Sequence, residues 1–102
     1  MYVLYEIKTN NIKQPSVCSD SEKSLVDIKK SSDLSCVIED KEVDFSLTGK
    51  TEIFAVCYQC DCSGDIMQDY GLFYASKSEA DQKCTELNEH GKKWNTVSIP
   101  IR

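Results

Sequence analysis

Apolar side chains alternate with polar ones over much of this chain, and this spacing constrains the fold more than any other feature. Residues 1–8 carry an unbroken apolar set on their odd-numbered positions, which predicts an N-terminal strand. The alternation returns over 34–38 and again over 43–47. Residues 53–60 are apolar on both parities, so we expect a central strand that is covered on both faces. The three later segments together predict an antiparallel meander.

Two stretches have helical signals instead. Ser76 and Glu79 have the spacing of a capping box, in which a serine and a glutamate satisfy backbone groups at the start of a helix. This helix is predicted to run to His90 and to end at Gly91, since glycine is favoured just beyond a helix. A thin apolar stripe predicts another short helix over 20–31, which depends on tertiary packing for its stability.

The remaining segments complete the predicted order β-α-β-β-β-(β)-α-β. Residues 70–74 and 94–101 have the pattern of short strands, whereas 9–16 and 61–69 are polar or turn-rich and are predicted to be connections. We therefore expect an α+β fold with an antiparallel sheet of about five to six strands and two helices packed mostly on one face. Residues 1–102 are predicted to form a single compact domain, and no internal repeat is visible.

The net charge of −5 is concentrated in the middle of the chain. Between positions 33 and 69 there are nine acids and two lysines. Direct binding to nucleic acid is disfavoured, because such affinity comes mainly from lysine and arginine neutralising phosphates. No apolar run approaches the roughly 20 residues of a membrane-spanning helix, and the first residues lack a signal-peptide pattern. We therefore expect a cytoplasmic protein that does not bind membranes.

Six cysteines leave three alternatives, namely disulfides, a zinc site and buried free thiols. Disulfides are disfavoured in a chain without a secretory signal. Cys57, Cys60 and Cys62 group three ligands that suit zinc, but positions 57 and 60 of one strand point to opposite faces. Buried free thiols are the favoured interpretation, and no cofactor is expected. A small zinc-stabilised, cysteine-rich interaction domain is kept as the alternative.

Groups suited to catalysis are scarce in this sequence. A nucleophilic cysteine would need a base, and the single histidine, His90, is predicted to lie in the last turn of a helix, where a positive imidazole suits the helix dipole. The Gly-x-Ser-x-Gly elbow of serine hydrolases is missing from the sequence. The sequence therefore predicts a protein that is not an enzyme.

The acidic middle of the chain favours protein binding. An acidic face can dock on a basic protein surface, including one whose role is to hold nucleic acid. Large apolar and aromatic residues among the acids would add the contact area typical of binding hot spots. The candidate partner-binding residues are Glu39, Asp40, Glu42, Asp44, Asp61, Asp65, Met67, Asp69 and Tyr70, with Ile66 and Phe73 beside them.

In size, acidity, scarcity of catalytic groups and α+β pattern, the chain resembles the small proteins with which phages disable bacterial defences, anti-CRISPR proteins among them. This resemblance implies an inhibitor that competes with guide RNA or target DNA for a basic groove, its carboxylates taking the place of phosphates. We also consider a homodimer formed through a sheet edge made by the first or last strand.

Overall fold

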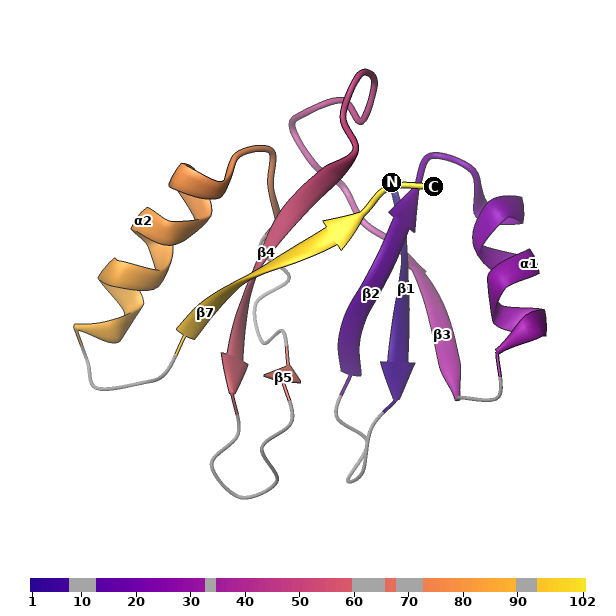
Figure 1. The fold of residues 1–102 in the computed structure, drawn as a ribbon, viewed down its shortest axis with the longest axis horizontal. Helices are drawn as coiled ribbons and strands as arrows, with labels where there is room; N and C mark the ends of the chain where they lie inside the picture. Colours follow the sequence, from indigo (N-terminus) through magenta and orange to yellow (C-terminus); the bar gives the residue numbers. More distant parts are fainter. Residues whose placement is uncertain (8–12, 33–34, 60–65, 68–72, 90–93) are drawn as a thin grey trace.

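The computed structural model describes residues 1–7, 13–32, 35–59, 66–67, 73–89 and 94–102 (Figure 1). The elements along the chain are β1 (Tyr2–Ile7), β2 (Lys13–Ser19), α1 (Glu22–Ser31), β3 (Cys36–Asp40), β4 (Glu52–Gln59), β5 (Ile66–Met67), β6 (Phe73–Tyr74), α2 (Lys77–Asn88) and β7 (Trp94–Pro100). They form an α+β fold with two antiparallel sheets. One sheet has the strand order β2-β1-β3. In the other, β4 lies between β7 on one edge and the short strands β5 and β6 on the other.

A serine lies at the N-cap of both helices. In α2, Oγ of Ser76 accepts a hydrogen bond from N of Glu79 at 3.3 Å, which confirms this half of the capping box. α1 begins after Ser21, with Glu22 in its first turn and two lysines in its last turn, where the helix dipole favours each charge. No helix in the described part of the chain combines the length and the apolarity that crossing a bilayer requires.

The two sheets belong to two successive units of the same topology. Unit 1 contains β1, β2, α1 and β3; unit 2 contains β4, β6, α2 and β7, with β5 inserted after β4. In both units the first strand lies between the other two and pairs antiparallel with each of them. The two helices lie on opposite outer sides of the molecule (Figure 1). The fold is therefore a duplicated ββαβ unit, a repeat of topology that is not visible in the sequence.

The strand registers define which residues of the two units correspond. In unit 1, Tyr2 of the central strand pairs with Ser19 and Asp40, and Ser19 lies two positions before the N-cap Ser21. In unit 2, Phe54 pairs with Tyr74 and Ser98, and Tyr74 lies two positions before the N-cap Ser76. Matching them gives Tyr2 with Phe54, Ser19 with Tyr74, Ser21 with Ser76, and Asp40 with Ser98. The offset between the units thus grows along the chain from 52 to 55 and then to 58 positions.

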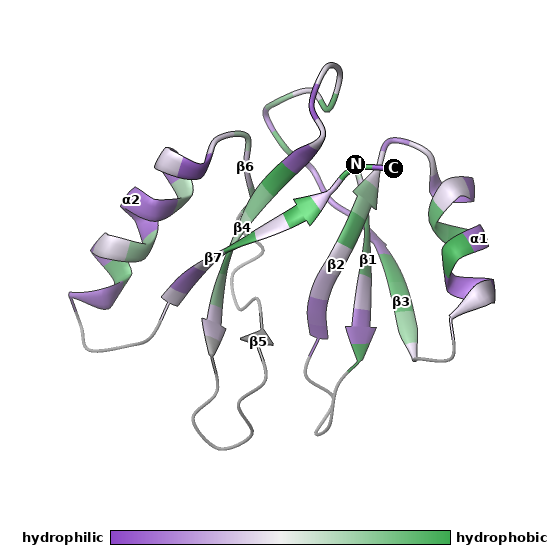
Figure 2. Cartoon of the chain, viewed as in Figure 1, coloured by the Kyte–Doolittle hydropathy of each residue, from purple (hydrophilic) through white to green (hydrophobic). Residues whose placement is uncertain are grey.

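The core follows the same duplication. Each helix packs on its own sheet over a separate cluster, which comprises Leu4, Val17, Leu25 and Cys36 in unit 1 and Val56, Ala80, Cys84 and Trp94 in unit 2. A third, central cluster lies between the units and includes Val3, Tyr5, Cys18, Ile53, Ala55, Cys57 and Ile99. In Figure 2 hydrophobic residues lie mainly on the strands, whereas both helices mix hydrophilic and hydrophobic residues. Because side chains of a strand alternate between its faces, β1 and β4 each supply one helix-side cluster and the central cluster.

The two units also meet at the ends of β2 and β7. Cys18 forms a parallel bridge with Ile101, and N of Arg102 donates to the carbonyl oxygen of Cys18 at 2.8 Å. The thiol of Cys18 lies 3.7 Å from the carbonyl oxygen of Pro100. The chain termini therefore lie close together at one end of the molecule, beside this junction (Figure 1).

The single sheet expected from the sequence is wrong, as is the expectation that both helices lie on one of its faces. The meander expected over 34–60 does not form, because β3 pairs with β1 whereas β4 pairs with β5, β6 and β7. The physical reason is burial. Two apolar sheet faces cover each other at the central cluster, so each helix is left to cover the outer face of its own sheet.

Two local expectations are also corrected. The sequence pattern predicts a connection over 9–16, yet β2 begins at Lys13; Pro15 is tolerated there because the register with β1 shifts beside it, as at a β-bulge. The alternation over 43–47 predicts a strand, but residues 41–51 contain none. Within this segment the chain turns at Gly49, whose φ of 75° favours glycine.

Candidate functional site

The connection between the two units exposes a row of carboxylates. Glu42 and Asp44 are exposed, while Val43, Phe45 and Leu47 between and after them pack against the central cluster. The predicted alternation therefore holds for burial even though this segment is not a strand. These apolar side chains hold the backbone of the segment in place. No ion pair to Glu42 or Asp44 occurs among the described residues. Both carboxylates are available to a partner.

Glu39, by contrast, is already neutralised within unit 1. Nζ of Lys13 donates a hydrogen bond to Oε2 of Glu39 at 2.6 Å, and Nζ of Lys41 lies 3.1 Å from Oε1. Both ammonium groups also lie over the ring of Tyr5, 5.9 and 5.8 Å from its centroid, in cation–π geometry. The hydrogen bond from Lys13 holds the pKa of Glu39 below its usual value. Glu39 therefore ties β2 and β3 together across β1.

This network predicts a pH-dependent contribution to stability. Because the pKa of Glu39 is lowered by folding, its contribution is present above the usual glutamate pKa and is lost as the pH falls through the lowered value. Glu39→Gln is expected to reduce the free energy of unfolding by about 1 kcal/mol at neutral pH. The same substitution should cost less at about pH 3 than at neutral pH, because the unfolded carboxylate is then protonated and part of the contribution is lost. Urea unfolding at both pH values measures the difference.

Glu42→Gln is the matched control for this measurement, because it removes an equal charge from an exposed position without an ion pair in the described part of the chain. It should change stability by less than about 0.5 kcal/mol at either pH. An equal loss for Glu39→Gln at both pH values would show that packing, not charge, accounts for its effect.

The other predicted binding residues are placed as follows. Asp40 is exposed and lies 3.6 Å from the N-terminal amine of Met1. Met67 lies in β5, and Phe73 is buried in the central cluster. The remaining predicted acids and aromatic, Asp61, Asp65, Asp69 and Tyr70, lie outside the described residues. The structure therefore brings Asp40, Glu42 and Asp44 together in one stretch of surface chain.

The strand edges bear on the predicted homodimer. β1 pairs on both of its edges, so this first strand offers no free edge. The last strand, β7, pairs with β4 on one edge and meets β2 only at its end. A homodimer through a sheet edge stays a prediction, and β7 rather than β1 would supply that edge.

The described cysteines are core residues. Free thiols are buried at Cys18, Cys36, Cys57 and Cys84. Burial raises the pKa of Cys57 to about 12 and that of Cys18 to about 11. Cys57 lies in the central cluster. Within the described residues, no three His, Cys, Asp or Glu side chains converge as metal ligands. Cys60 and Cys62 fall outside those residues, so the zinc alternative stays a prediction.

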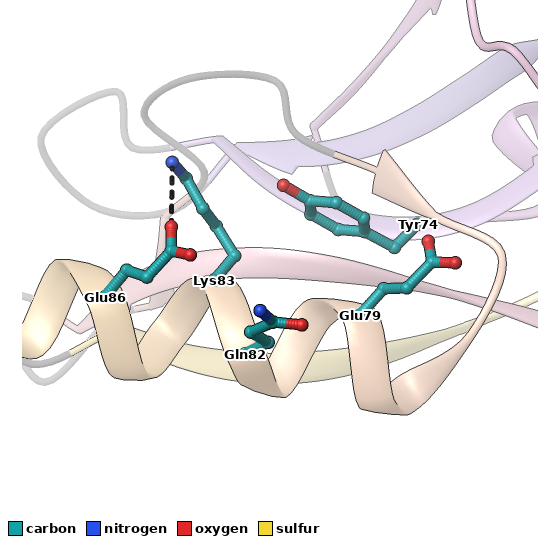
Figure 3. A pocket seen from close by; sticks show the side chains of 5 residues that line it. All are labelled: Tyr74, Glu79, Gln82, Lys83 and Glu86. Carbon is teal, nitrogen blue, oxygen red and sulfur yellow. Dashed lines mark ion pairs between the residues drawn. The ribbon is translucent and has the colours of Figure 1, made fainter.

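A shallow depression of about 270 Å³ lies on the outer side of unit 2, between β6 and α2. It is lined by Tyr74, Glu79, Gln82, Lys83 and Glu86 (Figure 3). The four helical residues recur at spacings of three and four, so they form one face of α2. The ring of Tyr74 lies along this face, between Lys83 and Glu79 (Figure 3). The depression thus combines an aromatic ring with two carboxylates and one amine.

The charges of this depression are only partly paired. Nζ of Lys83 lies 3.6 Å from Oε2 of Glu86. Asp81, the remaining acid in this part of α2, is held elsewhere, by Lys77 at 2.9 Å and by the hydroxyl of Thr96 at 2.5 Å. No ion pair to Glu79 occurs in the described structure. The lining therefore keeps one uncompensated negative charge.

Sequence reasoning places these helical residues on a solvated face and does not identify a site. Polar residues at helical spacing are typical of any exposed helix face, so the pattern alone does not indicate a depression. The available signal is Tyr74, an aromatic residue two positions before the N-cap serine of the helix. Comparisons of the chain with family models, curated proteins and solved structures find no match.

Proposed function

We propose that this protein is a non-enzymatic binding module that docks its acidic surface on the basic, nucleic-acid-binding surface of a partner protein. In this proposal it is a cytoplasmic inhibitor of the phage anti-defence type, with anti-CRISPR proteins as the nearest class. The observation that carries the proposal is the outward presentation of Glu42 and Asp44 from a segment whose apolar side chains are anchored in the core. Because the backbone of this segment is anchored, it loses little conformational entropy when a partner binds the carboxylates.

The other features agree with a binding role. Glu42 and Asp44 form no ion pair among the described residues, whereas Glu39 in the adjacent strand pairs with two lysines. The buried thiols of Cys18 and Cys57 have raised pKa values, which suppress the thiolate that a nucleophile requires. Surface charge of one sign accelerates association with an oppositely charged partner and makes affinity depend on salt.

The test reverses the charges of the exposed acids Asp40, Glu42 and Asp44. Asp40→Lys, Glu42→Lys and Asp44→Lys in one variant are expected to weaken binding to a purified guide-RNA-dependent nuclease, prepared without its guide, by at least about tenfold at low salt. Biolayer interferometry across a series of salt concentrations measures this affinity, and added guide RNA should displace the wild-type chain.

The matched control reverses three exposed acids elsewhere, at Glu22, Asp27 and Glu89, and so carries the same net charge. It should lose much less affinity than the first variant. The proposal fails if the variant at 40, 42 and 44 binds as tightly as the wild type at every salt concentration, or if guide RNA and the chain bind the nuclease together.

A further inference from the structure

The duplication of the fold provides an internal reference for the depression on α2. When the two units are matched by strand register and by the first residues of their helices, the lining residues correspond to residues of unit 1. These are Ser19, Ser24, Asp27, Ile28 and Ser31. There, Ser19 is buried and its Oγ accepts a hydrogen bond from N of Ser21 at 3.0 Å. Ile28 packs against the helix-side cluster of its unit. At these positions unit 1 therefore has three serines, one aspartate and one isoleucine, and none of the five is aromatic.

Unit 2 replaces this set with an aromatic ring and charged groups. Tyr74 takes the place of the buried serine, and Lys83 takes the place of the packing isoleucine. Tyr74 is half-buried and packs against the helix-side cluster, so one part of its ring is fixed while the depression exposes another. The aromatic ring and the two carboxylates of the lining are not a requirement of the ββαβ fold, since unit 1 has serines at the positions of Tyr74, Glu79 and Glu86.

Glu79 makes only half of a capping box in the described structure. In a full capping box the glutamate would also accept a hydrogen bond from the backbone of Ser76. Here the bond runs from N of Glu79 to Oγ of Ser76, and Glu79 lines the depression together with Tyr74 (Figure 3). An aromatic ring and a carboxylate that line one depression can bind a cation together, because the ring quadrupole and the negative charge both attract it.

We propose that this depression receives one cationic side chain, an arginine, from the partner protein. One positive charge neutralises the lining, whose two carboxylates are offset by a single amine. The planar guanidinium stacks on Tyr74 and donates hydrogen bonds to Glu79. The volume of about 270 Å³ lies below that of typical small-molecule pockets and suits a single side chain. The inference rests on the proposed function, since it supplies a second contact for a partner with a basic surface.

The test uses blocked arginine, N-acetyl-arginine methylamide, titrated into the whole ¹⁵N-labelled chain and followed by NMR. The expected result is a set of saturable shifts in the amides of α2 around Glu79 and Gln82. Blocked citrulline, which has the same shape without the charge, should give no saturable shift. Glu79→Gln is expected to weaken the arginine site about two- to fivefold, as expected for an exposed ion pair. Glu22→Gln, which removes a charge from the first turn of α1, should leave it unchanged.

The ring is tested separately from the charge. Tyr74→Phe keeps the aromatic face and should retain binding, whereas Tyr74→Leu keeps an apolar contact and should abolish it. Unchanged shifts in unit 1 show that either variant is folded. The inference is overturned if blocked arginine gives no saturable shift on α2, if citrulline binds equally, or if Tyr74→Leu binds as well as the wild type.

These outcomes are distinguishable from those that test the acidic surface. Shifts confined to residues 40–44 would overturn the depression as a site and leave the docking proposal standing. Arginine could instead bind on α2 while charge reversal at 40, 42 and 44 leaves the affinity for the nuclease unchanged. That result would support the depression as a site and contradict docking through the acids at 40, 42 and 44.

Discussion

Replacing Leu25 with alanine is expected to lower the free energy of unfolding by about 2–5 kcal/mol. Leu25 is fully buried and is the one buried residue of α1, which has only ten residues. A helix of this length is marginal without tertiary packing, so most of its stability comes from this side chain and its neighbours Leu4 and Val17. Urea unfolding followed by far-ultraviolet circular dichroism measures the loss.

Ser24→Ala is the matched control, because it changes the neighbouring position without removing a buried apolar side chain. It should shift stability by less than about 0.5 kcal/mol. We further expect Leu25→Ala to unfold in a single transition, since the central cluster draws side chains from both units. A loss below about 1 kcal/mol would contradict the importance of Leu25 for α1. A separate transition for unit 1 would contradict the coupling of the two units through the central cluster.

The positions of the helices and strands could be predicted more reliably than which strands pair with one another. The capping serine and the glutamate after it identify α2, and the unbroken apolar run identifies β4, because those signals are local. Which strands pair is not local. β1 pairs with one strand that follows it closely and with another beyond a helix, and alternation within each strand is the same for either partner. The sequence therefore could not distinguish one sheet from two.

The duplication escapes detection in the sequence for a geometric reason. A repeat is visible in a sequence when a fixed period relates its copies. In this chain the offset between corresponding residues grows from 52 at Tyr2 to 58 at Asp40, because the connections of unit 2 are longer. Corresponding core positions also differ in identity, as Leu25 and Ala80 do. Only the hydrogen-bonded register preserves the relation.

The candidate site, too, could be predicted from the sequence only in part. The outward direction of Glu42 and Asp44 could be predicted, because it follows from alternation in one segment. The neutralisation of Glu39 could not, since its partner Lys13 lies 26 positions earlier, in a segment whose sequence pattern predicts a connection. The depression on α2 depends on Tyr74 packing beside the helix, which is likewise a tertiary contact.

The two helix-side clusters solve the same packing problem with opposite distributions of volume. Unit 1 has a large residue on the helix, Leu25, and a small one, Cys36, on its third strand. At the corresponding positions unit 2 has a small residue on the helix, Ala80, and a large one, Trp94, on the strand. All four are buried. This exchange suggests that the volumes at the two positions compensate each other, because interiors are packed to a nearly constant density.

Trp94→Ala is therefore expected to lower the free energy of unfolding by about 3–5 kcal/mol, through the cavity that it leaves. The ring of Trp94 is 3% exposed and its centroid lies 5.6 Å from that of Tyr58. Its backbone N donates to Oδ1 of Asn88 at 2.8 Å, a bond that alanine retains, so the loss reports the side chain. Urea unfolding followed by circular dichroism measures it without the tryptophan signal.

The decisive measurement adds Ala80→Leu to that variant. In the wild-type background Ala80→Leu overfills the cluster and should cost about 1–3 kcal/mol. In the Trp94→Ala background the same leucine fills vacated volume and should restore at least about 1 kcal/mol, so the two substitutions are coupled in a double-mutant cycle. Ser78→Leu, on the exposed first turn of α2, is the control for added apolar area and should restore nothing. Additive losses for Ala80→Leu and Trp94→Ala would show that the two positions do not share volume, and the correspondence between the clusters would then be one of topology alone.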